Sequence, residues 1–324
     1  MLPLFKRFYE GRLSMERKKQ ILPVFAGMKN SWRLYVLMLP ALAWVVIFVY
    51  IPMYGLIIAF KDFRPRLGMI ASPWADPLLK HFSAFFSTAI AMTTISNTLI
   101  LSLLTIIFSF PVPIIFALLL NQIKHSGARK AIQTISYAPY FVSSVVVVSI
   151  LMVILSPGSG FVNTIITFFT QKEPKLFMSR PEYFRSIYII SNIWQTLGFS
   201  AIIYIAALTG ISPDLYEAAI VDGATKLDRI IHIDIPSIIP TIIIMFILAV
   251  GNIMTIGYEK VFLMQNGMNT VVSEIISTYV YKTGLLSAQY SFATAVGLFN
   301  AIVNFLILIA CNGITKKAAN ISIF

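Results

Sequence analysis

Side chains able to make or break bonds are few in this sequence, and their spacing forms no catalytic pattern. The 324 residues include 13 Asp and Glu, three His and one Cys. His81, His125 and His232 lie far apart and show none of the short spacings typical of metal ligands. The sequence also lacks G-x-x-x-x-G-K-[ST], the P-loop that binds nucleotide phosphates. We therefore expect this chain to have no catalytic residue and to bind no metal and no cofactor.

One charged segment, Tyr216–Pro240, lies between two apolar runs. Pro213 and Asp214 precede it and can begin a helix, with Asp214 as the capping residue. Gly223 would interrupt that helix at a tight turn, since glycine adopts backbone conformations that other residues avoid. A second short helix, from Lys226 to Asp234, is expected after the turn.

Two prolines, Pro236 and Pro240, are expected to end this second helix before the next apolar run begins. The alternative is a polar loop that only connects its neighbours. Ordinary short loops rarely carry two helical segments around a glycine, so we favour a segment that another molecule recognises.

Composition indicates an integral membrane protein. Hydrophobic residues make up 58% of the chain and charged residues 12%, and the mean hydropathy is +0.82. Six apolar stretches each approach the roughly 20 residues that cross a bilayer as a helix. The sequence therefore predicts an all-α membrane protein with one domain, 34–315, between a basic arm, 1–33, and a tail, 316–324. We place its spans at about 35–59, 97–121, 132–155, 187–209, 241–258 and 292–314.

The net charge of +12 follows largely from this topology. With the N-terminus in the cytoplasm, 15 of the 25 Lys and Arg residues fall on the cytoplasmic side, eight of them in the basic arm. This is the sign that the positive-inside rule requires. The same topology places the C-terminus and the segment Tyr216–Pro240 in the cytoplasm, and it leaves no need for a nucleic-acid partner.

The pattern Glu217-Ala218-Ala219, followed by Gly223 and Ile235-Pro236, resembles the EAA loop of binding-protein-dependent ABC importer permeases. Further stretches resemble the oligosaccharide branch of the carbohydrate-uptake members, and most closely the permease subunits of alginate-oligosaccharide importers. These stretches are Tyr50–Gly55, Ala59–Phe63, Asn97–Leu99, Ala117–Asn121, Ser273–Gly284 and Tyr290-Ser291. The resemblance covers most of 34–317. Ile230-Ile231 and Asp234 depart from the usual pattern.

The resemblance implies a type I ABC importer permease fold, a bacterial inner-membrane location and a coupling loop at 210–240 that docks on an ATPase. The implied coupling residues are Glu217, Ala218, Ala219, Asp222, Gly223, Ala224 and Pro236. The implied partners are a second homologous permease, two ATPase subunits that bind ATP and Mg, an external solute-binding protein and membrane lipid. On this reading the chain helps to import an oligosaccharide, alginate or another acidic one, and is not itself an enzyme.

Polar side chains within the predicted spans are candidates for the substrate path, because they are costly in hydrocarbon and tend to face the bundle interior. Amides both donate and accept hydrogen bonds, which suits sugars. The candidates are Asn192, Gln195, Tyr204, Asn252, Asn300 and Asn304. Hydrogen bonds between helices are an equally good explanation for each. Glu259 and Lys260, at the outer end of the predicted fifth span, are candidates for an external gate or a binding-protein contact, or simply interfacial anchors.

Two other classes of protein remain as alternatives. An ATP-independent carrier or channel would need coupling ions or pore charges, but no predicted span has a carboxylate near its centre. A membrane scaffold would not need amides in the last three spans. Neither alternative explains the charged segment.

Overall fold

The computed structural model describes residues 32–319 and 321–322, so nearly all of the predicted basic arm lies outside the described residues. The chain divides into two compact units at Ile57/Ile58, which are described separately. The first unit contributes most of a 29-residue apolar helix, Trp32–Phe60. It comprises α3 (Trp32–Val45), a π-helical turn, α4 (Ile51–Met53) and part of a 3-10 helix that ends at Phe60.

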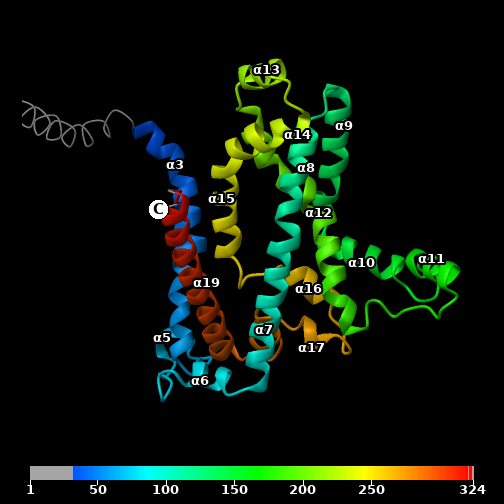
Figure 1. The fold of residues 1–324 in the computed structure, drawn as a ribbon. Coiled ribbons are helices and arrows are strands. Elements are labelled where there is room, and N and C mark those ends of the chain that lie inside the picture. The colour runs from blue at the N-terminus through cyan, green and yellow to red at the C-terminus, as the bar shows by residue number, and fades with distance from the viewer. Residues whose placement is uncertain (1–31, 320, 323–324) are drawn as a thin grey trace, which may run out of the picture. The chain divides into compact units, whose positions relative to one another are not determined.

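The second unit, Ile58–Phe324, is also helical, and among its described residues the only strand-like feature is a single bridge between Lys61 and Trp74 (Figure 1). Its long helices are α7 (Ala89–Leu104), α8 (Pro111–Asn121), α9 (Ser126–Tyr137), α10 (Ser144–Ile154), α11 (Phe161–Thr170), α12 (Pro181–Thr209), α15 (Ile235–Gly251) and α19 (Tyr290–Ala319). Its short helices are α5 (Gly68–Ala71), α6 (Lys80–Phe86), α13 (Pro213–Val221), α14 (Lys226–Arg229), α16 (Tyr258–Met264), α17 (Thr270–Ser273) and α18 (Ile276–Tyr281).

The described residues include five helices that are long and apolar enough to cross a membrane, or six if one bent pair counts as a span. This confirms the predicted all-helical membrane fold. The five are Trp32–Phe60, Ala89–Asn121, Pro181–Thr209, Lys226–Gly251 and Tyr290–Ala319. The predicted third span is the bent pair: Ser126–Phe141 and Ser144–Ile154 meet at 97°. Ser143 lies at the bend, where its hydroxyl accepts a hydrogen bond from the Val146 amide and starts α10 as a separate helix.

Three membrane-spanning helices each continue through a proline, and in each a π-helical turn ends two residues before that proline. Proline has no N–H, and its ring crowds the carbonyl four residues earlier. A π turn pairs a carbonyl with the N–H five residues later, as Ile230 does with Ile235. The helix therefore continues. The turns are Val46–Tyr50 before Pro52, Thr105–Ser109 before Pro111, and Ile230–Asp234 before Pro236.

Because of the π turn before Pro236, the limits of the fifth span differ from the predicted ones. Pro236 and Pro240 do not stop the preceding helix, since α14, the π turn and α15 run on as one helix from Lys226 to Gly251. The span thus begins earlier than predicted and ends at Gly251 rather than near residue 258. The prediction was wrong because it treated each proline as a helix breaker. In the structure Pro236 directly follows the π turn and Ile235, and Pro240 is accommodated inside the helix.

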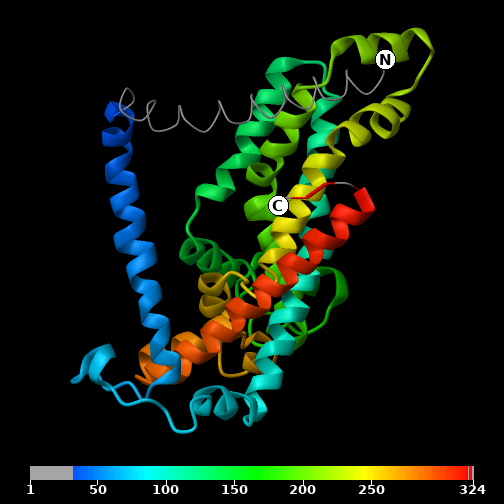
Figure 2. The ribbon, with the colours of Figure 1, turned by 90° about the vertical axis from the view of Figure 1, so that its left-hand side faces the viewer.

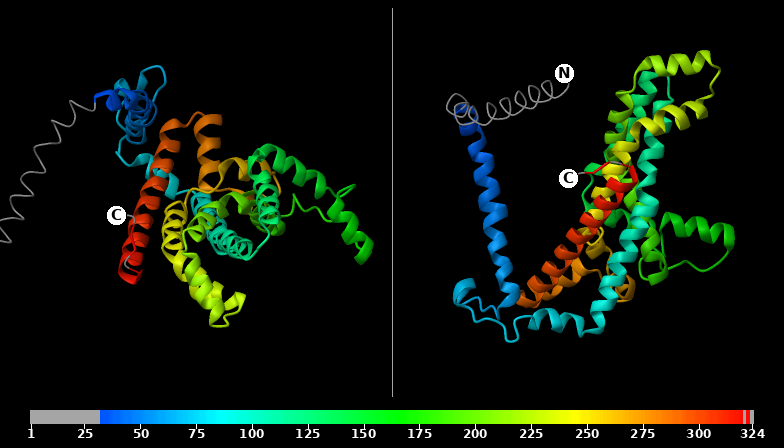
Figure 3. Two further views of the ribbon diagram at one scale, coloured as in Figure 1. Left: turned by 90° about the horizontal axis from the view of Figure 1, so that it is seen from above. Right: turned by 60° about the vertical axis from the view of Figure 1, so that its left-hand side comes forward.

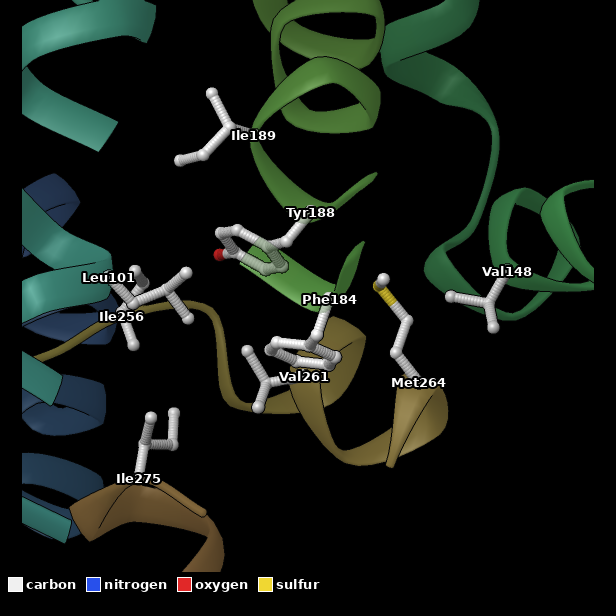
Figure 4. Close-up of a cluster of buried hydrophobic side chains, with 9 residues drawn as sticks. All are labelled: Leu101, Val148, Phe184, Tyr188, Ile189, Ile256, Val261, Met264 and Ile275. Carbon is white, nitrogen blue, oxygen red and sulfur yellow. The ribbon is translucent and has the colours of Figure 1, made fainter. Parts of the chain in front are cut away.

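Within the second unit, α12 is the central helix. It packs beside α8 and also contacts α9, α15 and α17, while α15 packs along α19 (Figures 2 and 3). Figure 4 shows the buried cluster that joins the N-terminal half of α12 to α16, with Phe184 and Tyr188 facing Val261 and Met264. A second cluster joins α12 to α8 and α15 through Ala201, Tyr204 and Ile238, among others.

Replacing Gly198 by Val is expected to prevent correct packing of α12 on α9. A Cβ at Gly198 would lie 2.2 Å from the Ser136 carbonyl oxygen, so the two helices must separate. We expect a loss of about 1–3 kcal/mol or more in stability, seen as a lower thermal midpoint and a lower monodisperse yield in detergent. Gly297→Val is the matched control, because no atom lies within 4 Å of a Cβ there. Equal midpoints for the two variants would contradict the packing argument.

Candidate functional site

The predicted coupling segment forms two helices around a sharp turn, at one end of the second unit (Figure 1). Ser212, not Asp214, is the capping residue of α13: its hydroxyl accepts a hydrogen bond from the Asp214 amide at 3.4 Å. Asp214 lies in the first turn, where a negative charge is favourable. Pro213 occupies the first helical position.

The turn after α13 is a Schellman motif that depends on Gly223. Gly223 has a φ of +80°, the left-handed conformation that glycine adopts without strain. The Gly223 amide donates to the Ile220 carbonyl, and the Ala224 amide donates to the Ala219 carbonyl at 2.8 Å. Thr225 and Asp228 then form a capping box that starts α14. Local hydrogen bonds therefore fix the angle between the two helices.

This helical pair exposes most of the predicted coupling residues. Glu217, Ala218, Asp222, Gly223 and Pro236 are exposed, and Ala219 and Ala224 are half-buried. Four large apolar side chains of α13 and α14 are also exposed: Leu215 (52%), Ile220 (57%), Val221 (87%) and Leu227 (63%). The sequence interpretation did not include these side chains among the coupling residues, although apolar residues between the charges of the segment were a usable signal. Acidic and apolar groups exposed together suit a protein-docking surface.

Asp234 was noted in the sequence only as a departure from the family pattern, yet it is completely buried. The Tyr216 hydroxyl donates a hydrogen bond to its Oδ1 atom. Gln122 donates to its Oδ2 atom at 2.9 Å, and the Asn121 amide lies 3.5 Å from Oδ1. These residues come from α13, from the C-terminal end of α8 and from the π turn before α15.

A second polar site is a cavity of about 310 Å³ between α12 and α16. It brings together four of the predicted residues, Asn192, Gln195, Glu259 and Lys260, together with three aromatic side chains from Tyr140, Tyr188 and Tyr258. Asn192 and Gln195 share one face of α12, as their spacing predicts. Amides, a carboxylate, an ammonium group and tyrosine rings can bind a sugar by hydrogen bonds and by stacking.

Glu259 and Lys260 are not at the outer end of the fifth span. They lie in α16, a separate short helix, because the span ends at Gly251. Lys260 is only 5% exposed. Its Nζ donates to Gln195 Oε1 at 3.2 Å and lies 5.8 Å from the centre of the Tyr188 ring. Burial lowers the pKa of Lys260 to about 8, so the ammonium form still predominates at neutral pH.

The other four predicted path residues do not line this cavity. Tyr204 is 3% exposed in the cluster that joins α12 to α8 and α15. Asn252 donates to the Leu248 carbonyl near the end of α15. Asn304 bonds to the Met254 amide at 2.8 Å and to Thr255 at 2.7 Å, and so ties α19 to the linker after α15. Asn300 Oδ1 is buried without a hydrogen-bond partner among the described residues.

Comparisons with known proteins agree with this architecture. Residues 110–316 match the family described as binding-protein-dependent transport system inner membrane component. The chain is 40% identical to the polygalacturonan/rhamnogalacturonan transport system permease protein YteP of Bacillus subtilis, over 93% of this chain and 92% of YteP. It is 39% identical to LplB of the same organism, over 90% of this chain and 91% of LplB.

Solved structures show the same fold. A chain of a bacterial alginate ABC transporter, in complex with an alginate pentasaccharide-bound periplasmic protein, is 38% identical with a TM-score of 0.84. The match covers 93% of this chain and 100% of that one. A chain of a bacterial ABC transporter involved in the import of the acidic polysaccharide alginate is 39% identical, with a TM-score of 0.83. That match covers 91% of this chain and 99% of the other. The helical membrane fold, the exposed segment around Glu217 and these matches together show that the chain belongs to the inner-membrane permeases of binding-protein-dependent ABC transport systems.

Proposed function

We propose that this chain is one of two homologous permease subunits in an ATP-driven importer of acidic oligosaccharides. A solute-binding protein delivers the sugar, and the two permeases form its path through the membrane. Two ATPase subunits bind ATP and Mg and perform the hydrolysis, while the permease does no bond chemistry. The observation that carries this proposal is the exposed helical pair around Glu217 in a chain that matches such permeases along nearly its whole length.

In this proposal α13 is the coupling helix on the cytoplasmic side. Glu217 pairs with a basic group of the ATPase, Ala218 and Ala219 allow close approach, and the turn at Gly223 and Ala224 sets the angle of the docking surface. Closure of the ATPases on ATP moves the segment. That movement shifts the path from outward to inward access, a rigid-body change of a kind common in transport proteins. The positive-inside rule supports this orientation.

The substrate class follows from the cavity beside α16 and from the names of the relatives. Lys260 is the cation in that cavity, and among the described residues no carboxylate oxygen lies within 4 Å of its ammonium nitrogen. The names of two similar proteins mention polygalacturonan and alginate. Both are polymers whose uronic-acid rings carry carboxylates. Glu259 also lines the cavity but forms no ion pair with Lys260, so a carboxylated sugar could supply the anion that the Lys260 ammonium group lacks.

The test is ATP hydrolysis by the reconstituted complex, with its binding protein, across uronic-acid and neutral oligosaccharides. Stimulation by uronic-acid chains alone is expected. Stimulation by neutral sugars would contradict the acidic substrate class but would still support the proposal that the chain is an importer permease. Sugar uptake without any ATP hydrolysis would favour an ATP-independent carrier and overturn the main proposal.

Replacing Gly223 by Pro should leave the chain inserted but should impair uptake. Proline fixes φ near −65° and cannot adopt the +80° of this turn. It also removes the N–H that bonds the Ile220 carbonyl. The altered turn would misplace α13 on the ATPase, and we expect uptake per inserted chain to fall by about tenfold. Gly223→Asn is the matched control, since Asn tolerates this conformation. Unchanged uptake in Gly223→Pro would contradict the assignment.

A further inference from the structure

The buried carboxylate of Asp234 is held by uncharged donors only. It is 0% exposed, and among the described residues no Lys, Arg or His nitrogen lies within 4 Å of it. Tyr216 donates to one carboxylate oxygen and Gln122 to the other. Asn121 completes the group, because its amide also reaches the Tyr216 hydroxyl at 3.4 Å. A buried charge is tolerated only when its hydrogen bonds are made, so removing one donor leaves a costly group unpaired.

Tyr216 is the donor in its bond with Asp234. Burial first, and then the hydrogen bond to Asp234, raise the pKa of Tyr216 to about 12. The hydroxyl therefore stays protonated at any physiological pH. A phenol that donates to a carboxylate forms a charge-assisted bond, which is stronger than a bond between two neutral groups.

The location of this group suggests a role beyond stability. Tyr216 immediately precedes Glu217 on α13, and α13 has no fully buried residue of its own. Asn121 and Gln122 lie where α8, the end of the Ala89–Asn121 span, gives way to the next turn. Asp234 lies in the π turn at the start of α15. One carboxylate thus connects an otherwise exposed helix to two membrane-spanning helices.

We propose that Asp234 and Tyr216 are positioning residues that hold α13 to the cytoplasmic ends of α8 and α15, so that movement of α13 is transmitted to both spans. This proposal rests on the proposed role of α13 as the coupling helix. Without the connection, the ATPases would still dock on α13 and hydrolyse ATP. Less of the movement of α13 would reach the two spans, so less sugar would be imported for each ATP hydrolysed.

The experiment compares Tyr216→Phe and Asp234→Asn with the wild-type chain in the reconstituted complex with its binding protein and sugar. The readout is the amount of sugar imported per ATP hydrolysed. We expect this ratio to fall by about tenfold in both variants, while hydrolysis continues. Tyr137→Phe is the matched control, because among the described residues the Tyr137 hydroxyl has no hydrogen-bond partner. It should keep the wild-type ratio.

A third variant separates positioning from folding. Tyr216→Phe combined with Asp234→Val removes the buried charge together with its Tyr216 donor. Only the neutral amides of Asn121 and Gln122 lose their partners, so the chain should regain stability without regaining the connection. We expect near wild-type assembly with a low transport ratio. A wild-type ratio in any correctly assembled variant of Tyr216 or Asp234 would overturn the proposal. Failure of the proposed function gives a different result, since the wild-type complex itself would then show no sugar-stimulated hydrolysis.

Discussion

Replacing Glu217 by Lys is expected to abolish import while the chain still folds and inserts. Glu217 is exposed on α13 and forms no ion pair within the part of the chain that the structure describes. The substitution therefore removes no interaction on which the fold depends. At an interface, however, it places a positive charge against the basic group expected on the ATPase. Disrupting one partner of a buried charge pair costs about 2–5 kcal/mol, so binding should weaken by about 100-fold.

The measurement has two parts, co-purification with the ATPase subunits and sugar-stimulated ATP hydrolysis in lipid. Glu217→Lys should lose both, and Glu217→Gln should lose less, because it keeps the shape without reversing the charge. Glu173→Lys is the control: it makes the same charge change at an exposed residue on a different loop. Normal assembly and normal hydrolysis in Glu217→Lys would show that α13 is not the docking helix.

Hydropathy was sufficient to predict the helical membrane fold, since an uninterrupted apolar run has no other stable form in a bilayer. The limits of two spans could not be predicted in the same way. The third span bends by 97° next to Ser143, and serine is too common in membrane helices to signal a break. The fifth continues past Pro236 after a π turn and holds Pro240 inside α15, whereas the sequence interpretation took both prolines as helix ends.

The two helices and the glycine turn of the segment around Glu217 were predictable because the segment is local: its caps and its turn lie within about twenty residues of one another. The cavity beside α16 was only partly predictable. The three-residue spacing of Asn192 and Gln195 places them on one face, but nothing in the sequence shows that Lys260 folds back against Gln195. The burial of Asp234 likewise depends on Gln122, which lies 112 residues earlier in the chain. Both features depend on contacts between segments that are distant in the sequence, and such contacts could not be predicted from the sequence alone.

Replacing Lys260 by Gln is expected to remove the preference for acidic sugars. A hydrogen bond to a charged group contributes about 1.5–3 kcal/mol, so loss of the ammonium should lower the response to uronic-acid oligosaccharides by about tenfold or more. The response to neutral oligosaccharides should not fall, because Gln retains polar atoms in the cavity. The measurement is binding-protein-dependent ATP hydrolysis and uptake, each as a function of sugar concentration for the two sugar classes.

Comparison with two other variants separates direct contact from a structural role. Lys260→Arg keeps the charge and should retain most of the acidic preference, whereas Lys172→Gln removes an exposed charge outside the cavity and should change nothing. An equal loss for acidic and neutral sugars in Lys260→Gln would mean that Lys260 acts only by holding Gln195. An unchanged preference would place carboxylate recognition elsewhere on the path. If Lys260→Gln loses the response to acidic sugars alone, and Lys260→Arg retains it, then the buried ammonium group of Lys260 recognises the sugar carboxylate.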